Sequence, residues 1–124
     1  MLLLDSHVVM WWLLEPERLS AAAIETITSA QDRVYVSSAS IWELEMKRFA
    51  GRLDVPGGIA DHAVEEGFTP LPISARHATR AAQLPMHHKD PFDRMLVAQA
   101  QLEHLTLVTS DRQFAAYDVP VLLP

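Results

Sequence analysis

The fold is decided by residues 89–111, KDPFDRMLVAQAQLEHLTLVTSD, which predict a helix followed directly by a strand. Asp90 is a favourable N-cap residue and Pro91 suits the first helical position, so we expect the helix to begin there and to run to about Glu103. Residues 106–109 are typical of a short buried strand. A helix that leads directly into a buried strand is the repeating unit of α/β folds.

The same alternation continues toward both ends of the chain. Further helices are expected at residues 8–14, 20–30, 41–50, 58–66 and 74–83. Further strands are expected at residues 2–4, 34–36, 69–73 and 119–123, and prolines mark the third of these as an edge strand. We therefore predict an α/β fold: a three-layer α/β/α sandwich with a central, mainly parallel sheet of about five short strands.

The composition is that of an ordinary globular protein, with 49% hydrophobic and 21% charged residues. We expect residues 1–124 to form a single domain. The sequence has no cysteine, which excludes disulfides, thiolate zinc sites and cysteine nucleophiles. Because the apolar run at residues 8–14 is too short for a membrane span and no signal-peptide pattern is present, we expect a cytoplasmic protein.

The net charge is −6, with 16 acidic against 10 basic side chains. Such a charge argues against non-specific binding driven by phosphate groups, so any contact with nucleic acid must be local. Local phosphate contacts could come from these basic residues: Lys47, Arg48, Arg52, Lys89, Arg94 and Arg112. Most of them could equally lie on solvated helix faces.

Four acidic residues are expected at one edge of the sheet, beyond the carboxyl ends of the strands. Asp5 and Asp111 follow the first and fourth strands, Glu43 lies early in the helix after the second strand, and Asp93 lies in the first turn of its helix. Crowded carboxylates repel one another unless a cation neutralises them. Oxygen ligands suit Mg²⁺ or Mn²⁺, and the chemistry that matches such a site is hydrolysis of a phosphodiester.

Each of these acids also has a purely structural explanation. Asp5 could cap the following helix, and Asp111 could form an Asx turn. Glu43 stands at the capping-box spacing from Ser40, and Asp93 could merely favour the helix dipole. We nevertheless favour ligation for all four, since an acid such as Asp93 at the head of an apolar helix stripe is poorly explained by solvation.

Asp90 differs from Asp93 in its position at the helix end. As the expected N-cap, Asp90 is assigned a structural role. His87 and His88 invite comparison with a zinc site, but adjacent side chains point in different directions and no third histidine stands at ligand spacing. We therefore expect a loop role for both histidines.

Four segments taken together resemble the PIN-domain family, and most closely its VapC-type toxins. The segments are LLLDSH at residues 2–7, SIWELEMK at 40–47, HKDPFDRMLVAQA at 88–100 and LVTSDRQF at 107–114. The resemblance implies an endoribonuclease that uses Mg²⁺ or Mn²⁺ to cleave RNA. It also implies inhibition by a small cognate antitoxin of VapB type, and a homodimer.

Carried over residue by residue, the family's metal-binding acids correspond to Asp5, Glu43, Asp93 and Asp111. Secondary positions of the site are Ser6, Asp90, Thr109, Ser110 and Arg112. The helix at residues 8–14 is apolar all round, which suits either a dimer partner or burial within the core. The residues alone do not decide between these two.

Two other functions remain open from the sequence. Asp5 could be the nucleophile of an aspartyl phosphatase, although those enzymes need a second acid two residues on, where this chain has His7. The chain could also be a non-catalytic PIN-like binding module. Calorimetry that detects no metal binding would identify such a module.

Overall fold

The computed structural model describes residues 1–30 and 33–124. Its strands are β1 (Leu2–Leu4), β2 (Val34–Ser37), β3 (Thr69–Leu71), β4 (Thr106–Val108) and β5 (Val121–Leu122). Its α-helices are α1 (Ser6–Leu14), α2 (Ala21–Ala30), α3 (Ser38–Phe49), α4 (Ile59–Glu65), α5 (Ala75–Gln83) and α6 (Pro91–Glu103). Short 3₁₀ helices in the described ranges are η1 (Pro16–Arg18) and η3 (Arg112–Ala116).

The strands form one sheet in the order β3-β2-β1-β4-β5, and the pairings between the described residues are all parallel. The predicted parallel α/β fold is therefore confirmed, and β3 lies at an edge as its prolines indicate. Central β1 pairs Leu3 with Tyr35 of β2 and with Leu107 of β4. From β1 the chain runs to β2 and β3 on one side of the sheet, and it then crosses to β4 and β5 on the other side. The topological switch point of the sheet therefore lies between β1 and β4.

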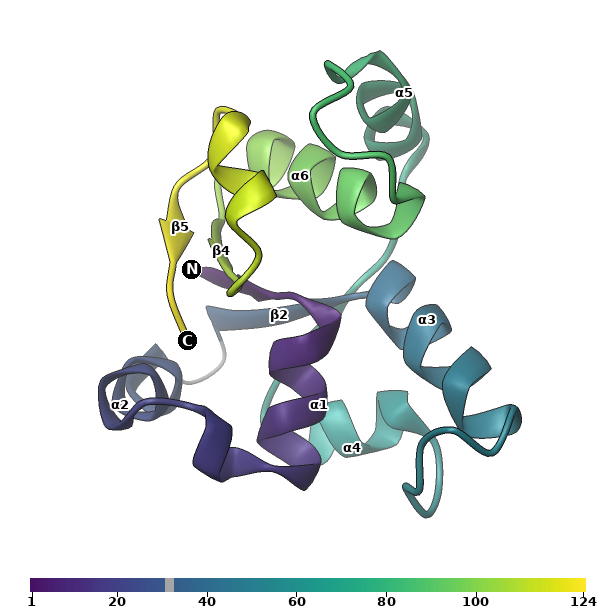
Figure 1. Cartoon of the computed structure of the whole chain (residues 1–124), viewed down its shortest axis with the longest axis vertical. Coiled ribbons are helices and arrows are strands. Elements are labelled where there is room, and N and C mark those ends of the chain that lie inside the picture. Colours follow the sequence, from purple (N-terminus) through teal and green to yellow (C-terminus); the bar gives the residue numbers. More distant parts are fainter. Residues whose placement is uncertain (31–32) are drawn as a thin grey trace.

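Helices cover both faces of the sheet, which gives the three predicted layers (Figure 1). Successive side chains of β1 point to opposite faces. Leu2 and Leu4 pack with the apolar residues of α1 to α4, whereas Leu3 packs with those of α5 and α6. Leu3 and Leu4 are fully buried, and each contributes roughly 2 kcal/mol through burial.

Contacts within the chain cover much of the apolar helix α1. Val8 and Val9 are fully buried. The Trp12 ring packs edge-on against Phe68, with centroids 5.5 Å apart, and its Nε1 donates to Glu66 at 3.2 Å. Burial in the core therefore accounts for much of the apolar character of this helix without a dimer partner.

Helix α3 begins earlier than predicted. Ser37 is its N-cap, with its hydroxyl accepting the Ala39 backbone N–H at 3.0 Å, because this serine directly follows the strand. Ser40 lies within the helix and is buried. The capping-box explanation for Glu43 is thus wrong.

Helix α6 has the predicted start. Asp90 is its N-cap, and its Oδ1 accepts the backbone N–H groups of Phe92 at 2.8 Å and Asp93 at 3.3 Å. The structural role expected for Asp90 is present.

Over the described ranges, residues 1–30 and 33–124, no helix is long and apolar enough to cross a membrane.

Candidate metal centre

Asp5 is fixed where β1 ends. It is the N-cap of α1, and its Oδ1 accepts the Val8 backbone N–H at 2.8 Å. Its Oδ2 accepts a hydrogen bond from the hydroxyl of Thr109, which lies just beyond β4. Asp5 is 4% exposed, and this burial is the main reason that the pKa of its carboxyl is raised, with the charge of Asp111 adding to the effect. Asp5 therefore has both roles that the sequence offered for it: it caps the following helix, and it lies at the predicted acidic site.

Thr109 connects the two strand-end acids. Its hydroxyl oxygen also accepts the Asp111 backbone N–H at 3.1 Å. Asp111 is the N-cap of η3, and its Oδ1 accepts the Gln113 N–H at 2.9 Å. A completely buried threonine thus holds both acids at the switch point of the sheet.

Asp93 is the acid most affected by its neighbours. Burial raises its pKa to about 7, and the charges of Asp90, Glu43 and Asp5 add to the shift. Glu43 itself is half-buried on α3. Glu43 and Asp5 thus act on Asp93, and Asp111 acts on Asp5, which links the four acids predicted from the sequence at one edge of the sheet.

His88 is part of the same cluster, which the sequence-based interpretation missed. Its Nε2 lies 2.9 Å from Oδ2 of Asp93 and 3.1 Å from Oδ2 of Asp111. The three side chains place potential ligand atoms within 4.8 Å of one another. The sequence signal for this contact is a histidine five residues before an acid at a helix start.

The remaining predicted positions differ in exposure. Ser6 is buried in the first turn of α1, whereas Ser110 and Arg112 are exposed beyond β4. Arg94 is not a phosphate contact, because it is 8% exposed and donates to backbone carbonyls on α5 and the loop that follows. Arg48 is paired with Glu45 at 2.9 Å. Fewer of the basic residues named from the sequence are therefore available to contact phosphate groups.

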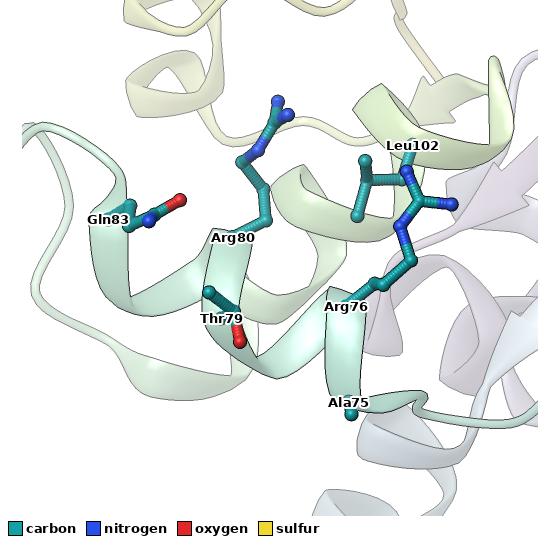
Figure 2. A pocket seen from close by; sticks show the side chains of 6 residues that line it. All are labelled: Ala75, Arg76, Thr79, Arg80, Gln83 and Leu102. Carbon is teal, nitrogen blue, oxygen red and sulfur yellow. The ribbon is translucent and has the colours of Figure 1, made fainter.

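A depression of about 320 Å³ between α5 and α6 does not belong to this cluster. Figure 2 shows Arg76 and Arg80 extending from α5 beside Leu102. Leu102 lies about 13 Å along the α6 axis from Asp93 at the usual helical rise. The acidic edge and this depression are therefore separate features.

The acidic cluster fits a divalent cation. Its donors are carboxylate oxygens, which hard cations prefer. The raised pKa values of Asp5 and Asp93 show that these carboxylates lie where extra negative charge is unfavourable, and a cation would relieve this cost.

In open α/β sheets, ligands bind beyond the carboxyl ends of the strands at the topological switch point, which is where this chain has its acids. The family model of the PIN domain matches residues 2–120. The chain belongs to the PIN-domain family. A curated relative, Ribonuclease VapC22 of Mycobacterium tuberculosis, is 36% identical over 125 residues, which cover 95% of this chain and 92% of the relative.

Solved structures show the same fold. FitAcB from Neisseria gonorrhoeae is similar with a TM-score of 0.70 and 26% identity, covering 98% of this chain and 96% of that chain. VapBC2 from Rickettsia felis, bound to a DNA fragment from its promoter, has a TM-score of 0.76 at 12% identity and covers 98% and 97% of the two chains. At that identity the second likeness speaks for the fold alone.

Proposed function

We propose that this chain is a metal-dependent endoribonuclease of VapC type in which Asp5, Glu43, Asp93 and Asp111 hold the ion. The observation that carries the proposal is the convergence of these acids at the switch point, with the pKa of Asp93 raised to about 7. The similarity to a named ribonuclease supports the activity. We take Mg²⁺ or Mn²⁺ as the ion, residues 1–124 as one nuclease domain, and the cytoplasm as its location.

The chain's own residues divide the work at the site. A bound ion would supply Lewis-acid activation of water and of the scissile phosphate. Asp5 and Asp111 are held rigidly, because both oxygens of each carboxylate are engaged by neighbours. Glu43 and Asp93 approach from helices, and exposed Arg112 is available to contact the RNA backbone.

A phosphatase with Asp5 as nucleophile is not favoured. An attacking carboxylate must meet the phosphorus atom of a whole phosphate group, whereas Asp5 is buried and fixed by hydrogen bonds from Val8 and Thr109. This geometry suits a fixed ligand better than a nucleophile.

For partners we propose a small antitoxin of VapB type and a second copy of the chain. The similarity to Ribonuclease VapC22 supports the first, because the resemblance to VapC-type toxins implies such an antitoxin. An exposed apolar groove between α3 and α6 supports the second. It is lined by Ala39, Trp42, Met46, Ile73, Pro91, Phe92 and Met95, and Trp42 in it is 61% exposed.

The activity is tested with end-labelled RNA and DNA strands of the same sequence, incubated with purified protein and either Mg²⁺ or Mn²⁺. Internal cleavage of RNA alone is expected. Stable complex formation with the product of a neighbouring short reading frame, followed by loss of cleavage, would support the antitoxin assignment. Absence of metal binding in calorimetry, together with no cleavage of any RNA in a broad panel, would favour the non-catalytic module.

A further inference from the structure

His88 is held in place from several sides. Its backbone N–H donates to the Tyr117 hydroxyl at 2.9 Å, and its carbonyl accepts from Arg94 at 3.3 Å. Its ring packs against Phe114, with centroids 5.7 Å apart. Tyr117 in turn donates to the Pro85 carbonyl at 2.8 Å, which ties down the loop that carries the histidine. A side chain anchored in this way has a defined position before any ligand arrives.

The hydrogen bonds of the ring fix its tautomer. The Asp90 backbone N–H donates to Nδ1 at 3.2 Å, so Nδ1 acts as the acceptor and the proton of the neutral ring belongs on Nε2. Nε2 therefore donates to Asp111 at 3.1 Å and lies 2.9 Å from Asp93. The ring could offer Nε2 to a metal only if its proton moved to Nδ1, and this would break the hydrogen bond from the Asp90 backbone N–H.

We infer that His88 is a positioning residue of the metal centre: its Nε2–H holds Asp93 and Asp111 together and does not ligate the ion itself. The inference deepens the proposed nuclease function and rests on it. Two carboxylates that repel each other would otherwise move apart, and rebuilding the site would cost binding free energy. Hydrogen bonds to metal ligands commonly affect metal affinity 10-fold to 100-fold.

The chain offers a matched set of variants. His88→Ala removes the donor, whereas His88→Gln retains an N–H donor at a comparable reach from the backbone. His87→Ala removes the adjacent, exposed histidine, whose ring packs 5.1 Å from Tyr117, and serves as the control. Tyr117→Phe removes the hydroxyl that anchors the His88 backbone without changing an acid.

The test is calorimetric Mn²⁺ titration of the full chain, together with the Mn²⁺ electron paramagnetic resonance spectrum. We expect affinity to fall about 10-fold or more in His88→Ala. Affinity should fall less in Tyr117→Phe, recover substantially in His88→Gln and stay unchanged in His87→Ala. The wild-type spectrum should show no nitrogen coupling.

Three outcomes would overturn the inference. Equal Mn²⁺ affinity of wild type and a folded His88→Ala variant would contradict the positioning role while leaving the proposed function intact. Nitrogen coupling that His88→Ala abolishes would make His88 a ligand. Failure of the wild type itself to bind Mn²⁺ would remove the proposed metal site and the inference with it. Thermal unfolding checks that each variant is folded. If His88→Ala does not fold, the Mn²⁺ affinities of His88→Gln and Tyr117→Phe relative to wild type test the positioning role instead.

Discussion

Asp93 and Asp90 stand three positions apart and have different tasks. Asp90 accepts two backbone N–H bonds at the start of α6, a local role that the dipeptide Asp90-Pro91 predicts without any knowledge of the fold. Asp93 owes its raised pKa to burial and to charges that come from other elements. Sequence spacing can identify Asp93 as a candidate metal ligand, but only the fold shows how strongly its charge is disfavoured.

The two aspartates should respond differently to substitution. Asp90→Asn keeps an N-cap acceptor and should retain RNA cleavage, while Asp90→Ala should lose about 1 kcal/mol of unfolding free energy. Asp93→Asn should abolish cleavage and leave the metal-free protein as stable as wild type or more so, because it removes a repelled charge. Thermal unfolding and cleavage assays measure both. An active Asp93→Asn beside an inactive Asp90→Asn would reverse the assignment.

The raised pKa of Asp93 also predicts an unusual dependence of stability on pH. Between pH values near the ordinary 3.8 and about 7, the folded protein keeps a proton that the unfolded chain has released. Rising pH through this window therefore lowers the unfolding free energy contributed by this group, and the loss is complete above it. Asp5, whose pKa is also raised, acts in the same direction.

Thermal unfolding in chelator at about pH 5 and about pH 8 tests this dependence. The stability of Asp93→Asn relative to wild type should be greater at the higher pH. Asp61→Asn, a change at an exposed acid on α4, is the control and should show no such difference. A constant offset between wild type and Asp93→Asn at both pH values would contradict the raised pKa.

Helix α6 and the loop before it form one supporting unit. Arg94 of α6 donates to the carbonyls of Ala81 and Leu84 at 2.8 and 2.9 Å, and further to those of Pro85 and His88. It thereby completes the end of α5 and fixes the segment that carries the histidine. The sequence placed this arginine among possible phosphate contacts, because nothing in its spacing shows that the guanidinium is buried.

Removal of this support should destabilise the protein. We expect Arg94→Met to lower the unfolding free energy by about 2 kcal/mol or more, because buried carbonyls lose their donor. Arg52→Met, at an exposed position, should stay within about 0.5 kcal/mol of wild type. Urea denaturation provides the comparison. Equal stability of Arg94→Met and wild type would show that water replaces the guanidinium at no cost.

At the scale of the whole molecule, the alternation of strands and helices predicted the α/β class and the edge position of β3, because period and proline placement are local signals. The order of the strands was not predicted, since periodicity identifies strands but not their neighbours. His88 was missed for a similar reason: its approach to Asp111 joins residues 23 positions apart. The apolar character of α1 is largely explained by burial, so the proposed dimer now rests on the groove beside Trp42.

The dimer is tested by light scattering over a range of micromolar concentrations. Trp42→Glu places a charge in the groove and should weaken self-association at least about tenfold, or 1.4 kcal/mol. Phe49→Glu is the matched control, because Phe49 is 79% exposed on the same helix but does not line the groove. A wild-type monomer at all concentrations, or equal effects of the two changes, would contradict this interface.

The central claim is that four carboxylates hold the ion that RNA cleavage requires. Its most direct test follows cleavage of one RNA by wild type and by Asp5→Asn, first in excess chelator and then after Mn²⁺ is restored. Wild type should be inactive in chelator and recover fully, and Asp5→Asn should remain inactive throughout although folded. Undiminished cleavage by wild type in chelator, or cleavage by Asp5→Asn at the wild-type rate, would contradict the account.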